Sequence, residues 1–196
     1  MKFVMAAIML AGVLIAMAAA AVYGGWFNVA ADEPHSGLIY SIMETVRSRS
    51  IAKRAREAHP PALDDPALIA TGARHYAAMC SECHVAPDQK DSELRSGLYP
   101  KPPNLTQPIK ATAGEAFWAI KHGIKMSGMP AWGVTHDDQS IWALVAFVQK
   151  LPGLSATEYH ALAGDGHPHS HEPHEHTGKT DHNHSHKRNA PGNHHD

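Results

Sequence analysis

The sequence predicts an all-α protein whose folded domain spans residues 65–152, between an apolar N-terminal helix and a polar tail. Three observations lead to this fold class. Apolar side chains recur at helical spacing, as at Ile141, Leu144, Val145 and Val148. No stretch shows the strict apolar–polar alternation of a half-buried strand. Segments rich in Pro, Gly and Asp separate the periodic stretches, as connections between helices do.

The N-terminal segment is predicted to be a membrane anchor over residues 1–27. Residues 3–22 are all apolar or small, and a transmembrane helix needs about 20 such residues. The apolar stretch of a cleavable signal peptide is shorter, roughly 7–15 residues. Tyr23 and Trp26 occupy the expected interfacial position. Lys2 precedes the run and acidic residues follow it, so we expect the N-terminus in the cytoplasm and the rest outside.

Residues 28–64 are predicted to hold an amphipathic, basic helix and a linker. A helix is expected from Ser36 to Ala58, ended by the prolines that follow His59. Its first half has an apolar stripe and its second half is basic, with Leu38, Ile39, Ile42, Met43 and Val46 followed by Arg47, Arg49, Lys53, Arg54 and Arg56. One interpretation is a helix that lies on anionic lipid or docks an acidic partner. The other is a solvated spacer.

Within residues 65–152 the expected helices alternate with loops. Asp65-Pro66 is typical of a helix start, with Asp as the cap and Pro in the first turn. The expected helices run from there to Cys80, from Ala113 to His122 and from Asp137 to Leu151, with loops over 86–103 and 123–134.

Cys80-Ser81-Glu82-Cys83-His84 matches the C-x-x-C-H motif of covalent haem attachment. Two thiols one helical turn apart can both add to the vinyl groups on one edge of a porphyrin, and the next residue then places an imidazole beneath the iron. A zinc site would need further ligands at a second such motif. A thioredoxin-like pair belongs with a βαβ pattern. A structural disulfide would leave His84 unexplained.

The second axial ligand of the iron is expected in the loop after residue 122. A haem iron with His on one face can take Met on the other, which suits electron transfer. Met129 is the chosen candidate because Gly128 and Pro130 restrict its backbone. Met126 is the alternative. His75 and His122 are further candidates for the sixth iron ligand. Both methionines could instead fill gaps in the core.

Several segments in order resemble the class I c-type cytochromes, in their membrane-anchored bacterial form. Gly72-x-x-x-Tyr76-x-x-x-Cys80-x-x-Cys83-His84 resembles the family's first helix and motif, and Pro102-Pro103-Asn104-Leu105 resembles its proximal loop. Phe117-Trp118-x-Ile120-Lys121-x-Gly123-Ile124, Gly128-Met129-Pro130-Ala131-Trp132 and residues 141–148 resemble its distal segment and last helix.

The resemblance implies a class I cytochrome c fold, with three main helices around one covalent haem c. It implies that Cys80 and Cys83 attach the haem and that His84 and Met129 ligate the iron. It also implies that the Pro103 carbonyl accepts from the proximal histidine and that Gly72 lets two helices cross closely at Phe147. Trp118 and Trp132 are expected as walls of the haem pocket, or as ordinary core residues.

The implied function is one-electron transfer at the periplasmic face of a bacterial inner membrane. A six-coordinate iron has no open position for a substrate, so we expect no catalysis. The expected partners are a membrane electron-transfer donor and a terminal oxidase or reductase. The chain has 17 Lys and Arg against 19 Asp and Glu, which argues against nucleic acid as a partner.

Residues 153–196 are predicted to be a linker and a disordered, histidine-rich tail. From Gly164 onward no apolar periodicity remains, so this part cannot bury enough surface to offset its ordering entropy. Imidazoles at H-x-H spacing suit Cu, Ni or Zn, and they occur at His167, His169, His171, His174, His176, His182, His184 and His186. A pH-switched polycation or a segment without selected function are the other interpretations.

Two further functions therefore stay open. The tail could make the protein a metal-handling protein in which Cu, Ni or Zn binding is coupled to the redox haem. A labile Met129 could instead make it a haem-based gas or redox sensor.

Overall fold

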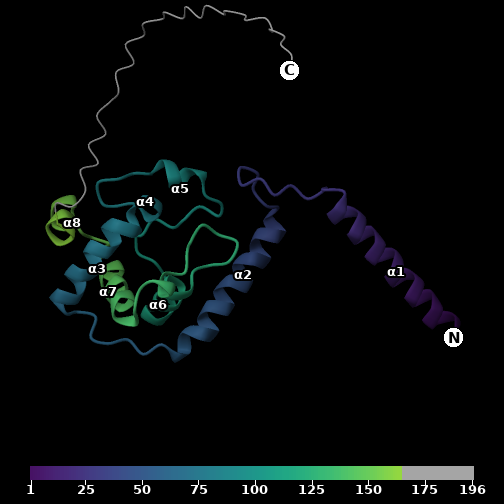
Figure 1. The fold of residues 1–196 in the computed structure, drawn as a ribbon, viewed down its shortest axis with the longest axis horizontal. Coiled ribbons are helices and arrows are strands. Elements are labelled where there is room, and N and C mark those ends of the chain that lie inside the picture. Colours follow the sequence, from purple (N-terminus) through teal and green to yellow (C-terminus); the bar gives the residue numbers. More distant parts are fainter. Residues whose placement is uncertain (165–196) are drawn as a thin grey trace, which may run out of the picture.

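The computed structural model describes residues 1–164, which are all-helical and contain no strand (Figure 1). The helices are α1 (Lys2–Tyr23), α2 (Gly37–Arg54), η1 (Ala55–Glu57), α3 (Pro66–Met79), α4 (Ser81–His84), α5 (Glu93–Gly97), α6 (Ala113–His122), η2 (Trp132–Val134), α7 (Asp138–Lys150) and α8 (Ala156–Ala163). The predicted fold class is confirmed, and the three main helices of the domain are α3, α6 and α7.

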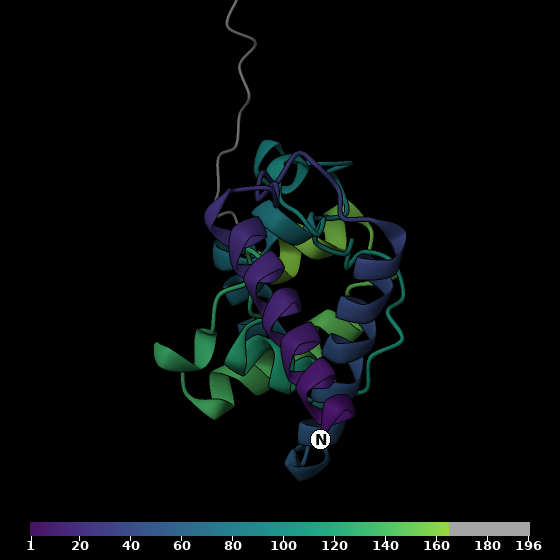
Figure 2. The ribbon, with the colours of Figure 1, turned by 90° about the vertical axis from the view of Figure 1, so that its right-hand side faces the viewer.

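Helix α1 stands apart from the helical body in Figure 1, and in Figure 2 the same helix runs in front of the body. None of its residues is buried. It is 22 residues long with a mean hydropathy of 2.5 over its most apolar window, so it is long and apolar enough to cross a membrane. A run of apolar side chains without packing partners in the protein is suited to a lipid environment.

Side-chain caps explain where the domain helices begin. The Asp65 carboxylate accepts from the backbone N–H of Ala67 at 2.8 Å, with Pro66 in the first turn of α3. Asp137 caps α7 in the same way. Helix α6 starts with a capping box between Thr112 and Glu115. These local signals account for the agreement between the predicted and observed helix starts.

The core forms where α3 crosses α7 at Gly72. A Cβ atom on Gly72 would lie 1.9 Å from the backbone oxygen of Ala143 and 2.8 Å from the Cβ of Phe147. The two helix backbones are therefore in direct contact, as the family resemblance implied. Tyr76 and Phe147 next to this crossing are fully buried, and their ring centroids lie 5.3 Å apart.

Helix α2 is packed onto the domain and is not a free spacer. At its C-terminal end, Ala55 is buried, and a Cβ on Gly114 of α6 would lie 2.9 Å from the Ala55 carbonyl oxygen. Just before its N-terminal end, the backbone N–H of His35 donates to the Tyr99 hydroxyl at 3.1 Å. Contacts at both ends thus hold α2 along one edge of the domain (Figure 1).

Residues 153–164 correct the predicted linker. They contain α8, which packs on α3 and places Tyr159 in the core beside Tyr76 and Phe147. A capping box between Ser155 and Glu158 starts this helix. The domain therefore extends to about residue 164. The predicted disordered tail, residues 165–196, lies outside the described part of the chain.

Replacing Gly72 by alanine should destabilise the fold because the new methyl group would push α3 and α7 apart. We expect a loss of about 3 kcal/mol in the free energy of unfolding, measured by denaturant titration with helical circular dichroism. Gly37→Ala in α2 is the control, since a Cβ there meets nothing within 4 Å. Its effect should stay within about 0.5 kcal/mol. Equal effects of the two substitutions would contradict the close crossing.

Candidate functional site

The motif cysteines lie on a single turn between α3 and α4. The backbone N–H groups of Cys83 and His84 both donate to the Cys80 carbonyl oxygen, at 3.1 and 2.8 Å. The two thiols are not joined in a disulfide. Burial raises the pKa of Cys80 to about 12, and burial and the Glu82 charge also raise the pKa of Cys83. A reactive thiol pair needs a lowered pKa, so this environment disfavours a thioredoxin-like pair.

A buried hydrogen bond sets the direction of the chain after the motif. Val85 has a φ of 60°, which is strained for a β-branched residue and costs about 1–3 kcal/mol. The Tyr76 hydroxyl donates to the Val85 carbonyl oxygen at 2.6 Å, and both residues are fully buried. After the turn at Val85, the chain comes back to the motif further along. The backbone N–H of Leu105 donates to the carbonyl oxygen of His84 at 3.2 Å. The proximal loop thereby returns to His84.

The imidazole of His84 is oriented by Pro103. The His84 Nδ1 atom lies 2.9 Å from the Pro103 carbonyl oxygen. A carbonyl only accepts, so Nδ1 carries the proton and Nε2 keeps a free lone pair for a metal. Burial lowers the pKa of His84, while the bond to Pro103 opposes this shift. A lowered pKa keeps the ring neutral at pH 7, which is the form that ligates iron.

The loop that supplies Pro103 is more structured than predicted. The expected loop over 86–103 contains α5, which begins after Ser92, whose side chain accepts from the N–H of Arg95 at 3.0 Å. The Arg95 Nε atom donates to the Pro102 carbonyl oxygen at 3.1 Å, and its guanidinium pairs with Asp91. Arg95 thus braces the segment that orients His84. Ser92 at the cap position and Glu93 in the first turn are local signals of this helix.

The distal loop distinguishes the two candidate methionines. Gly123 ends α6 with a φ of 64°. The Met129 carbonyl oxygen then accepts from Ile124 N–H at 3.2 Å, and Met129 N–H donates to the Ser127 hydroxyl at 3.2 Å. Met129 is half-buried, whereas Met126 sits at the turn with a φ of 58° and is 81% exposed. The backbone therefore holds Met129 firmly and presents Met126 to solvent.

The residues fit a covalently attached haem. Two unpaired thiols lie on one turn, His84 offers a free Nε2, and Met129 offers a sulfur from a braced loop. The family model described as cytochrome C oxidase, cbb3-type, subunit III matches residues 67–148. The chain carries a class I c-type cytochrome domain. This domain implies a covalent haem c and electron transfer through it. The comparisons with curated proteins and with solved structures gave no match.

The two tryptophans that were predicted as haem-pocket walls differ in their surroundings. Trp132 packs against the core and lies edge-on to His136, with ring centroids 5.7 Å apart. Trp118 is half-buried outside that core cluster and lies against the exposed His122 ring at 4.8 Å. The packing of Trp132 agrees with the core alternative, and a haem-pocket role stays a prediction for both tryptophans.

The two other histidines considered as ligands have different neighbours. His122 is exposed beside Trp118. His75 lies on α3 with its ring 5.5 Å from that of His136, and its pKa is lowered by burial and by the His136 and Arg74 charges. Neither histidine shares the braced loop that carries Met129.

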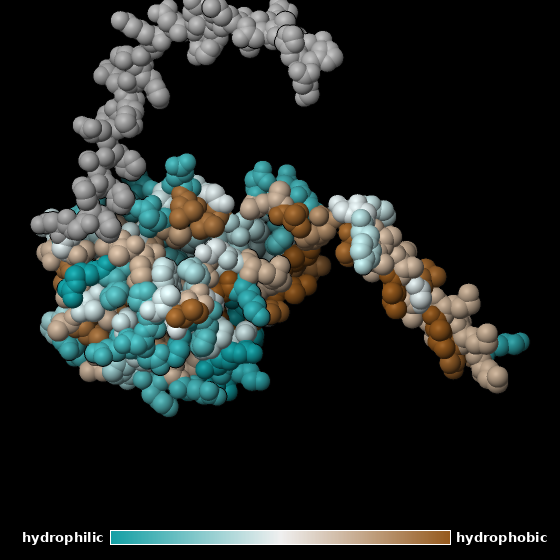
Figure 3. Space-filling view, viewed as in Figure 1, coloured by the Kyte–Doolittle hydropathy of each residue, from teal (hydrophilic) through white to brown (hydrophobic). Residues whose placement is uncertain are grey.

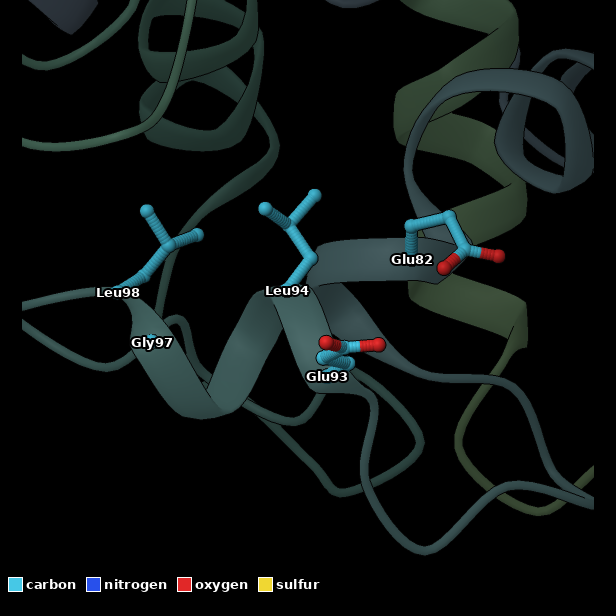
Figure 4. A pocket seen from close by; sticks show the side chains of 5 residues that line it. All are labelled: Glu82, Glu93, Leu94, Gly97 and Leu98. Carbon is cyan, nitrogen blue, oxygen red and sulfur yellow. The ribbon is translucent and has the colours of Figure 1, made fainter. Parts of the chain in front are cut away.

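A hollow of about 470 Å³ opens beside the attachment motif of the cytochrome. It is lined by Glu82 of α4 and by Glu93, Leu94, Gly97 and Leu98 of α5 and its end. Figure 4 shows Leu94 and Leu98 rising side by side from α5 into this space. A Cβ on Gly128 would lie 2.5 Å from a Leu98 methyl carbon. The apolar side of the hollow therefore reaches the loop of Met129.

The predicted metal sites of the tail, His167 to His186, lie outside the described residues. Within residues 1–164 no group of three or more His, Cys, Asp or Glu side chains is arranged to hold a metal ion. The haem residues are thus the metal site that the described part of the cytochrome supports.

Tyr76→Phe should destabilise the cytochrome because it leaves the buried Val85 carbonyl oxygen without a partner. Loss of a buried hydrogen bond in this manner costs about 1–3 kcal/mol. Denaturant unfolding of the haem-bearing protein would measure the change. Tyr40→Phe is the matched control, since Tyr40 is 46% exposed on α2, and it should leave the stability unchanged. If Tyr76→Phe left the free energy of unfolding unchanged, the hydrogen bond from Tyr76 would not support the strained turn at Val85.

Proposed function

We propose that this protein is a membrane-anchored one-electron carrier with a His84/Met129-ligated haem c. The observation that carries the proposal is the pair of fixed ligands. The 2.9 Å contact from His84 Nδ1 to the Pro103 carbonyl oxygen prepares Nε2 for iron, and two backbone hydrogen bonds hold Met129. Bound haem c supplies an iron that gains or loses one electron, with a potential raised by methionine ligation.

The contribution of the chain is to keep both ligands in one geometry. Arg95 holds the proximal loop through Pro102, and Ser127 holds the distal loop through Met129. Rigid ligands need little rearrangement when the charge of the iron changes, which favours fast electron transfer. Two filled axial positions leave none for a substrate, so we propose that the protein is not an enzyme.

We propose that α1 anchors the cytochrome in a bacterial inner membrane, with the haem domain at the periplasmic face. The length and apolar character of α1 support an anchor. Covalent haem attachment is a feature of exported domains, which supports the orientation. The matched family, described as a cbb3-type oxidase subunit, supports a membrane electron-transfer donor and a terminal oxidase or reductase as partners.

Substitution of the two methionines tests the ligation. In Met129→Ala we expect complete loss of the weak far-red sulfur-to-iron absorption band of the oxidised protein, a lower reduction potential, and carbon monoxide binding by the reduced protein. Met126→Ala is the matched control and should leave the spectrum and the potential unchanged. The measurement is visible spectroscopy of the purified full chain in detergent, combined with a redox titration.

If the far-red band were lost only in Met126→Ala, Met126 and not Met129 would be the sixth ligand of the iron. Carbon monoxide binding by the unsubstituted protein at neutral pH would favour the sensor alternative, because it requires an axial position that opens readily.

A further inference from the structure

Helix α2 carries an apolar stripe that no part of the described chain covers. Its members are between 38% and 73% exposed, namely Leu38, Ile39, Ile42, Met43 and Val46. They recur at helical spacing and so share one face of α2. Figure 3 shows hydrophobic surface along α2 on the side turned toward α1. An exposed apolar face of this kind on a helix marks an interaction surface.

The other faces of α2 show that the stripe is directed away from the domain. Glu44, Arg47 and Ile51 are half-buried and continue the face that ends at the buried Ala55, against α6. By helical periodicity the stripe lies roughly opposite that face. Helix α2 contacts the domain through this inner face. The domain therefore cannot also cover the stripe unless α2 detaches and turns over.

A basic surface continues the apolar stripe along the same side of the helix. Arg49 and Lys53, which are exposed, follow Ile42 and Val46 at helical spacing. Arg56 in η1 extends the row. The face is thus apolar near α1 and cationic farther from it. This arrangement matches lipid acyl chains next to anionic headgroups, the setting in which interfacial amphipathic helices bind.

The position of α2 in the chain also favours lipid over a protein partner. Only residues 24–36 separate it from α1, which is apolar enough to span a membrane. Trp26 and Phe27 in that connection are 77% and 60% exposed, as expected of aromatic side chains at a membrane surface. The connection is itself docked, because His35 contacts the Tyr99 ring and donates to its hydroxyl.

We propose that α2 lies in the membrane–water interface, with its apolar stripe among the acyl chains and its basic row on anionic headgroups. The proposal rests on the proposed anchoring through α1. Since α2 is bound to the domain at both ends, it fixes the orientation of the cytochrome against the bilayer. The haem domain is then held at one angle to its membrane-embedded partners and does not swing on a flexible tether.

Cysteine labelling of the full haem-bearing chain in vesicles tests this arrangement. Ile42→Cys lies on the stripe, and Ser48→Cys, on the exposed polar face of the same helix, is the matched control. The vesicles contain phosphatidylcholine and phosphatidylglycerol, and the probe is a charged maleimide that does not cross membranes. The thioether bonds of Cys80 and Cys83 leave both unreactive. Each rate is divided by that of the same variant unfolded in guanidinium.

We expect Ile42→Cys to react at least about tenfold more slowly than Ser48→Cys, because the stripe is inside the lipid. Val46→Cys repeats the measurement on the stripe and should behave like Ile42→Cys. Vesicle flotation on a density gradient provides the second readout. Flotation with equal labelling rates would overturn the proposal for α2 and leave the anchor intact. A chain that does not float would overturn both proposals, since neither helix would then be in lipid.

Discussion

The rest of the domain depends on the direct contact between the backbones of α3 and α7 at Gly72. Only a residue without a side chain allows this approach, because a Cβ there would lie 1.9 Å from the Ala143 carbonyl oxygen. The crossing places Tyr76, one turn further along α3, against Phe147. From that buried position the Tyr76 hydroxyl reaches the Val85 carbonyl oxygen and stabilises the turn after the attachment motif. The contacts that form the core therefore also support the haem site.

The two proposed axial ligands are positioned by different physical means. His84 is oriented by a side-chain hydrogen bond to a backbone carbonyl oxygen, and Arg95 braces the loop that provides this carbonyl. Met129 has a thioether that makes no strong hydrogen bond, so its position relies on the backbone bonds of its own loop. The proximal loop fixes the ring orientation of His84, and the distal loop fixes the backbone path at Met129. In the proposed carrier both would limit movement of the ligands when the iron changes charge.

Helix α2 joins the proposed anchor to the cytochrome domain as a docked element and not as a flexible linker. Its inner face packs on α6 through Ala55, and the segment before it is docked on Tyr99. The same helix leaves Ile42 and its apolar neighbours exposed on the side of α1. In the proposed arrangement, a rigid element with one face on the protein and another on lipid would fix the orientation of the haem domain against the membrane.

Local signals in the sequence determined the helix starts at Asp65, Thr112 and Asp137, the attachment motif and the apolar run of α1, because caps, motif spacing and periodicity involve residues close in the chain. The tertiary structure alone decided what depends on distant contacts. It showed that Met129, already favoured by its neighbours Gly128 and Pro130, is half-buried while Met126 is exposed. It also placed helix α8 where a linker was predicted. The capping box of α8 was visible in the sequence, but burial of Tyr159 against α3 and α7 is a contact across the whole domain, and no local pattern encodes it.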